Sequence, residues 1–191
     1  MKTNQLIPHH RKHRLPEFDY SQPGTYFVTI VTQDRKTLFG QIVDGEMVLN
    51  NIGKMVEEVW IAIPDHFPNV ELGGFVFMPN HFHGIVTITE GATHGTKSGA
   101  PISNLVEATH ASPLPRVSKG PIPGSIGAIT GSIKSATTKA FHEFPGHSED
   151  RLWQQGFYDR VIRNEREFEA IYDYILANPM NWDEDEEFFS E

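Results

Sequence analysis

The hydrophobic and polar positions along the chain follow a period of two in some segments and a helical period in others. Segments rich in β-branched and aromatic residues are typical of strands when turn residues bound them. We expect strands of this kind at residues 24–32, 70–77, 82–89 and 153–162. A short hairpin is expected at 39–49, because the pair Asp44-Gly45 suits the tight turn between its two arms.

Apolar residues recur at helical spacing in three segments. The first predicted helix starts at Asn50 or Asn51, either of which can cap it, and ends at Pro64. The second begins at Ser125, and the third occupies residues 165–177 before a proline. The expected core-facing residues are Ile52, Met55, Val56, Val59, Trp60 and Ile63, then Ile126, Ile129, Ile133, Ala140, Phe141 and Phe144, then Phe168, Ile171, Tyr172 and Ile175.

The order strand, helix, two strands, helix, strand predicts an α+β fold: an antiparallel sheet with helices on one face, followed by an extra C-terminal helix. A length of 191 residues fits one domain, which we place at residues 1–182. Gly, Ser, Thr, Ala and Pro dominate from about 90 to 124, which predicts a flexible insert. Residues 183–191 form an acidic tail.

Composition excludes several kinds of site. The chain has no cysteine, which rules out disulfides, thiolate zinc sites and a cysteine nucleophile. No apolar run approaches the roughly 20 residues of a membrane span, and the first five residues lack the apolar core of a signal peptide. We therefore expect a soluble, cytoplasmic protein with no membrane partner.

The formal net charge of −9 argues at first against a nucleic-acid partner, but the charges are segregated. Six acidic residues lie in the last nine positions, whereas the N-terminal arm carries Lys2, Arg11, Lys12 and Arg14. This separation is compatible with phosphate binding beside a solvated or autoinhibitory tail. It is equally compatible with ordinary surface charge.

His81 and His83 stand at the start of a predicted strand. Because strand side chains alternate between faces, both imidazoles are expected on one face, where they can bind one divalent metal ion. Tyr174 and Asn178 likewise share a face of the last predicted helix. A tyrosine can attack phosphorus with metal assistance, and an amide oxygen suits a hard cation. From these residues alone, hydrogen-bonding histidines, a core tyrosine and a helix-ending asparagine stay open as alternatives.

Several sequence blocks resemble those of the REP-associated tyrosine transposases, a branch of the single-tyrosine HUH transposases. The blocks are residues 24–29 (GTYFVT), 78–83 (MPNHFH), 125–129 (SIGAI) continuing to Lys134-Ser135, 153–163 (WQQGFYDRVIR) and 174–179 (YILANP). They follow the family's order from about Phe18 to about Trp182 and leave the insert and the acidic tail uncovered.

The resemblance implies a ferredoxin-like domain that binds Mg²⁺ or Mn²⁺ through His81, His83 and Asn178. It implies that Tyr174 attacks single-stranded DNA, leaving a 5′-phosphotyrosine link and a free 3′-hydroxyl. Relatives often have glutamine where this chain has Asn178, which is shorter by one methylene. Tyr158, in a strong block, is the rival nucleophile; we prefer Tyr174 because its helix pairs it with Asn178.

The implied partner is single-stranded or hairpin DNA, read by shape and by a few unpaired bases, in the bacterial nucleoid. The candidate phosphate contacts are Arg11, Lys12, Arg14, Lys134, Arg160 and Arg163. Family likeness also suggests a homodimer. Three alternatives stay open: a domesticated hairpin-binding protein that does not cut, a metal hydrolase with a water nucleophile, and a relative of replication initiators or relaxases, which usually carry a larger partner domain.

Overall fold

The computed structural model describes residues 18–90 and 121–184 of the chain. Three expectations therefore lie outside the described residues: DNA contacts by Arg11, Lys12 and Arg14, the greater part of the insert, and all but the start of the acidic tail. In the part that is described, no helix is long and apolar enough to cross a membrane.

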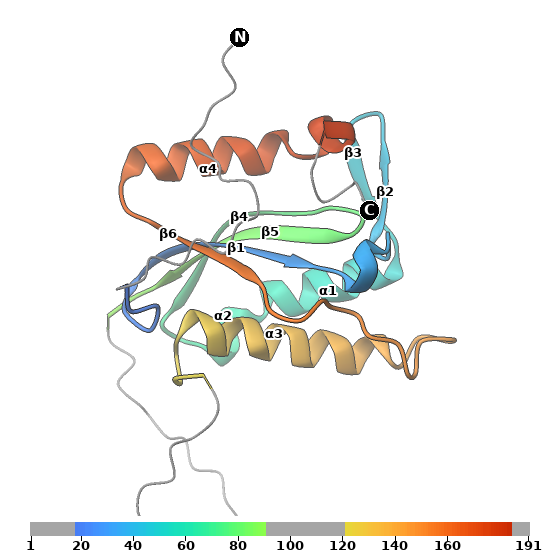
Figure 1. The fold of residues 1–191 in the computed structure, drawn as a ribbon, viewed down its shortest axis with the longest axis horizontal. Coiled ribbons are helices and arrows are strands. Elements are labelled where there is room, and N and C mark those ends of the chain that lie inside the picture. The colour runs from blue at the N-terminus through green and yellow to red at the C-terminus, as the bar shows by residue number, and fades with distance from the viewer. Residues whose placement is uncertain (1–17, 91–120, 185–191) are drawn as a thin grey trace, which may run out of the picture.

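The described core is one four-stranded antiparallel sheet in the order β4-β5-β1-β6. Its strands are β1 (Gly24–Val31), β4 (Val70–Phe77), β5 (His81–Ile88) and β6 (Tyr158–Ile162). Helices α1, α2 and α3 cover one face, and α4 lies alone on the other (Figure 1). The structure thus confirms the α+β fold with an extra C-terminal helix, and β5 and β1 are its central strands.

Helix starts follow the local sequence. The helices are α1 (Asn51–Ile61), α2 (Ile63–His66), α3 (Ile126–Phe141) and α4 (Glu165–Ala177), with 3-10 helices η1 (Gln33–Arg35) and η2 (Pro179–Glu184). The side chains of Asn50, Ser125 and Asn164 each accept a backbone N–H from the first turn of α1, α3 and α4 respectively. A separate hairpin, β2 (Gly40–Val43) and β3 (Glu46–Leu49), turns at Asp44-Gly45 as expected.

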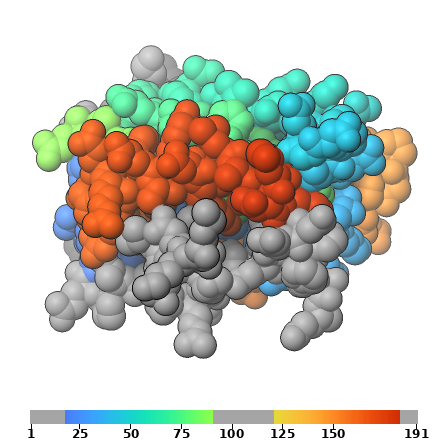
Figure 2. Space-filling model, turned by 90° about the horizontal axis from the view of Figure 1, so that it is seen from above, coloured from blue at the N-terminus to red at the C-terminus, as the bar shows by residue number. Residues whose placement is uncertain are grey.

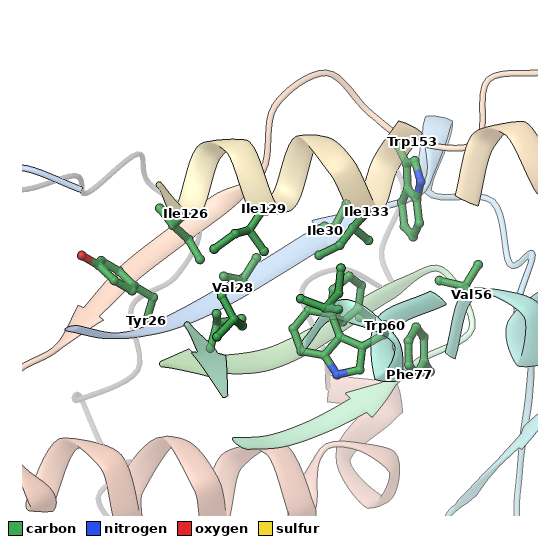
Figure 3. Close-up of a cluster of buried hydrophobic side chains, with 14 of the residues drawn as sticks. Tyr26, Val28, Ile30, Val56, Trp60, Phe77, Ile126, Ile129, Ile133 and Trp153 are labelled. Atoms are coloured by element: carbon green, nitrogen blue, oxygen red, sulfur yellow. The ribbon is translucent and has the colours of Figure 1, made fainter. Parts of the chain in front are cut away.

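The main hydrophobic core lies between the sheet and helices α1 and α3. Alternate residues of β1, namely Tyr26, Val28 and Ile30, pack with the isoleucine stripe of α3 and with Trp60 of α1 (Figure 3). Burial of these side chains supplies the main stabilising free energy of the domain. Because strand side chains alternate, the intervening residues of β1 and β5 face α4 instead.

Three predicted boundaries differ from the structure by more than one residue. Pro64 does not end the first helix but lies in the first turn of α2, where a missing N–H costs nothing, so the segment forms two helices. The last strand begins at Tyr158 rather than Trp153. Trp153 instead forms an isolated bridge with Thr32, and its indole N–H donates to Thr137 Oγ1 at 2.9 Å. The second predicted helix also ends at Phe141, before Phe144.

Candidate active site

The strand register places one row of side chains across the whole sheet on the face that α4 covers. His83 of β5 is paired with Val76 of β4 and with Thr29 of β1, and Thr29 is paired with Tyr158 of β6. Directly paired residues in antiparallel strands point to the same face. His81 lies two residues before His83 and shares that face, and both side chains are buried. The predicted same-face histidine pair is confirmed.

Three ligand-type atoms converge on this face. The Nε2 atoms of His81 and His83 are 3.1 Å apart, and the Tyr174 hydroxyl of α4 lies 3.2 Å from His83 Nε2. The rings of His83 and Tyr174 have centroids 5.2 Å apart. The structure therefore brings together Tyr174 and the histidine pair, although Tyr174 and His83 are 91 residues apart in the chain.

Asn80 determines which ring nitrogen of His81 faces Tyr174 and His83. Its side-chain Nδ2 donates to the backbone carbonyl of Arg35 at 3.3 Å, so its Oδ1 faces His81 Nδ1 at 2.7 Å. An amide oxygen only accepts, so His81 Nδ1 carries the proton in this network. In the neutral ring the lone pair is then on Nε2, the orientation that a metal-binding histidine needs.

His83 is held from its other side by β1. Thr29 Oγ1 lies 2.7 Å from His83 Nδ1, and the ring of Phe27 stacks on the imidazole with centroids 5.2 Å apart. When the threonine hydroxyl accepts from Nδ1–H, the lone pair of His83 also points from Nε2 toward His81. Both rings thus have a polar partner on the side away from the converging atoms.

Asn178 is the third residue expected to bind a metal ion. It caps the end of α4, between Tyr174 and Trp182, whose ring stacks on His81 with centroids 6.1 Å apart. Its side chain is buried, and its Oδ1 has no hydrogen-bond partner among the residues that the structure describes. A buried carbonyl oxygen without a donor is costly, and a divalent cation would satisfy it. The residues present therefore fit a bound metal ion.

This donor set is electrically neutral. Over residues 18–90 and 121–184, no three His, Cys, Asp or Glu side chains cluster as a metal site. Two imidazoles, a phenol and an amide would leave the charge of a divalent cation uncompensated. Such a centre favours an anionic oxygen, for instance from a phosphate, as a further ligand.

Arg160 and Arg163, two expected phosphate contacts, both reach Glu167 in the first turn of α4. Arg160 Nη2 is 3.4 Å from Glu167 Oε1, and Arg163 donates to the same carboxylate through its guanidinium and its backbone N–H. The hydrogen bond from Arg163 lowers the pKa of Glu167 to about 2, against the effect of burial. These contacts fasten the start of α4 to β6.

Lys134 is not brought to the site. It belongs to α3, on the opposite face of the sheet, and its ammonium donates to the backbone carbonyls of Gln154 and Gly156 at 2.5 and 2.6 Å. Burial lowers its pKa. These contacts hold the loop before β6, and a contact of Lys134 with DNA stays a prediction.

Tyr158 shares the row of His83 but is two strands away from it, with Thr29 in between. Tyr174, by contrast, contacts His83 directly. The roles of Asn80 and Thr29 were missed from sequence. Asn80 stood next to the histidines and could have been suspected, whereas Thr29 contacts a histidine 54 residues away and needed the strand register.

Comparisons with known proteins give the following likenesses. No protein-family model matches the chain. The solved structure of a REP-associated tyrosine transposase bound to a REP hairpin superposes with a TM-score of 0.54 at 19% identity, covering 92% of this chain and 74% of that one. At this identity the likeness shows a shared fold. An uncharacterized protein of Haemophilus influenzae is 36% identical over 186 residues, which are 97% of this chain and 96% of the relative. On that identity and coverage, the chain belongs to the same protein family as the Haemophilus influenzae protein.

Proposed function

We propose that the chain is a metal-dependent single-strand DNA endonuclease and transposase that cleaves and rejoins DNA beside REP-like hairpins. The observation that carries this proposal is the contact of the Tyr174 hydroxyl with a same-face histidine pair, at 3.2 Å from His83 Nε2. The shared fold with a REP-associated tyrosine transposase bound to a REP hairpin supports it. The blocks that resemble this family include the expected nucleophile and the expected metal ligands, namely Tyr174, His81, His83 and Asn178.

The assignment of roles follows from the donor atoms. His81 and His83 through Nε2, and Asn178 through Oδ1, would hold Mg²⁺ or Mn²⁺, and the ion would withdraw charge from the non-bridging oxygens of the scissile phosphate. Tyr174 supplies the nucleophilic oxygen. Asn80 and Thr29 orient the two imidazoles.

The reaction exchanges one phosphate ester for another. A bond forms between Tyr174 Oη and phosphorus while the bond from phosphorus to the 3′-oxygen breaks. The phenol loses a proton and the leaving 3′-oxygen gains one, so no proton is consumed overall. Attack by a 3′-hydroxyl on the 5′-phosphotyrosine reverses the step and rejoins a strand. Water takes part in neither step, so the number of phosphate ester bonds stays the same throughout.

DNA binding in this proposal uses residues at two places. Arg163 keeps 58% of its side chain exposed while it contacts Glu167, so a phosphate can approach its outer edge. The basic N-terminal arm would contact the hairpin backbone, as its sequence suggests. The strand is single at the cut, and pairing in the adjacent hairpin places it.

A denaturing-gel assay tests the proposal. Labelled single-stranded hairpin oligonucleotides are incubated with the protein, with Tyr174→Phe and with Tyr158→Phe, in Mg²⁺, Mn²⁺ or chelator. We expect a covalent protein–DNA band that requires metal and Tyr174 and persists in Tyr158→Phe. A band that survives Tyr174→Phe contradicts the nucleophile assignment. Tight hairpin binding without any covalent band supports the alternative of a binding protein that does not cut.

A further inference from the structure

A hollow of about 490 Å³ lies beside the candidate active site, between the β2–β3 hairpin and η2. Figure 2 shows η2, in red, against the hairpin, in blue to cyan. This volume falls within the range of small-molecule sites in proteins, roughly 300–1,000 Å³. The hollow is therefore large enough for one nucleobase or a similar flat group.

The hollow and the active site share a wall. Pro79 lines the hollow and precedes Asn80 and His81 in the chain, and Pro179 lines it and follows Asn178. Trp182 lines it too, and its ring stacks on His81. A phosphate held at the histidine pair would therefore have this hollow next to it.

The lining suits an uncharged ring better than an anion. Among the residues that the structure describes, none that lines the hollow is charged. A phosphate or carboxylate placed there would lose hydration without gaining a cation. The lining combines apolar groups, among them Met180 and Trp182, with the amide-bearing and hydroxyl-bearing residues Gln41 and Thr37. Apolar faces with a few hydrogen-bonding groups are what binding of an unpaired base requires.

We propose that this hollow binds the unpaired base of a nucleotide that flanks the scissile phosphate. The inference rests on the proposed function and extends it, because it gives the enzyme a means to select the base at the cut. Met180 is the informative residue: it lines the hollow, and 80% of its surface is exposed. Its truncation therefore removes packing area for the base without disturbing the core.

The test compares DNA with and without the base. Hairpin oligonucleotides carry an abasic site at one or the other nucleotide flanking the cut, and dissociation constants are measured by fluorescence anisotropy in the Tyr174→Phe background, which prevents cleavage. Removing the bound base should weaken binding about fivefold or more. In Met180→Ala the abasic substitution should matter much less, because the base no longer packs against the Met180 side chain.

Leu176→Ala is the matched control, because Leu176 is also a largely exposed apolar residue near the end of α4 but does not line the hollow. It should keep the full abasic effect. Equal affinity for intact and abasic hairpins, or an abasic effect of the same size in Met180→Ala, overturns the proposed base site and leaves the proposed function standing. Failure of the intact hairpin to bind overturns both.

Discussion

Asn80 joins two parts of the site through one side chain. Its amide nitrogen donates to a backbone carbonyl of η1 and its amide oxygen accepts from His81, so η1 helps to fix the orientation of a candidate metal ligand. A side chain of this kind contacts neither metal nor DNA. Its effect on metal affinity is nevertheless measurable, because removing an outer partner of a ligating histidine typically costs about 10–100-fold in affinity.

We therefore expect Asn80→Ala to weaken Mn²⁺ binding about tenfold or more, measured by electron paramagnetic resonance or calorimetry. Asn80→Asp keeps the acceptor for His81 Nδ1 and should retain most of the affinity, although it loses the donor to Arg35. Thermal unfolding in chelator monitors the fold of both variants. If alanine and aspartate behave alike, the hydrogen bond to His81 is not what Asn80 contributes.

Asn178 allows a test in which stability and metal binding move in opposite directions. In Asn178→Leu the buried, unpartnered Oδ1 is replaced by apolar atoms of similar volume. We expect an equal or higher unfolding temperature in chelator, together with a loss of about tenfold or more in Mn²⁺ affinity. Differential scanning calorimetry with and without Mn²⁺ measures both. Unchanged Mn²⁺ stabilisation would remove Asn178 from the ligand set.

At the scale of elements, α4 is fixed to β6 through Glu167. This carboxylate has a pKa of about 2, below its ordinary value of 4.5, because Arg163 hydrogen-bonds to it. Because the pKa of Glu167 is lower in the folded protein than in the unfolded chain, its ionised form stabilises the fold at any pH above about 4.5. This stabilisation disappears as the pH falls from about 4.5 to 2. We expect Glu167→Gln to lower the unfolding free energy by about 1–3 kcal/mol at pH 7.

In the same variant, the free energy of unfolding should depend less on pH in the acidic range. Urea unfolding at several pH values measures this dependence. Wild type and Glu167→Gln should converge in stability toward pH 2. Parallel curves across the whole range would contradict a stabilising role for the ionised carboxylate.

Two glycines in different elements should respond oppositely to alanine. A Cβ at Gly84, in β5, would lie 2.5 Å from Trp60 Cζ2 in the core, so Gly84→Ala should cost about 1–3 kcal/mol of unfolding free energy. Gly131 is exposed in the middle of α3 with no atom within 4 Å of a Cβ, so Gly131→Ala should add about 0.5–1 kcal/mol. Denaturant unfolding of the pair checks both signs, and a stabilised Gly84→Ala would show that Trp60 repacks.

Sequence periodicity predicted what depends on near neighbours in the chain. The shared face of His81 and His83, the spacing of Tyr174 and Asn178 and the starts of the first two helices at Asn50 and Ser125 are local properties. The start of β6 could not be predicted, because Trp153 is withdrawn from the sheet by a hydrogen bond to Thr137 of α3. Likewise, only the pairing of β1 with β5 sets Thr29 beside His83, and pairing between distant strands is not encoded in either strand alone.

For the whole molecule, the sequence places basic residues away from the acidic tail, and the DNA-binding proposal depends on that separation. Replacing Arg11, Lys12 and Arg14 by alanine should raise the Kd by a similar factor for hairpins of every DNA sequence. The slope of log Kd against log salt should fall by about one unit for each phosphate that these side chains neutralise in the wild type. Anisotropy titrations between about 50 and 300 mM salt, a range around physiological conditions, measure the slope. An unchanged slope would place the phosphate-binding residues elsewhere.

The attachment of α4 at both ends has a consequence for how a broken strand is handled. Glu167 ties its beginning to β6, and beyond its end the ring of Trp182 rests on His81, with Tyr174 in between. Under the proposed function, a DNA end joined to Tyr174 would thus be held on a helix that has contacts at both ends. The other end, carrying the 3′-hydroxyl, would be the one that moves. The 3′-hydroxyl that first reaches the phosphotyrosine would then decide the product of each reaction. The original 3′ end would restore the old strand, and a different 3′ end would join the DNA to a new one.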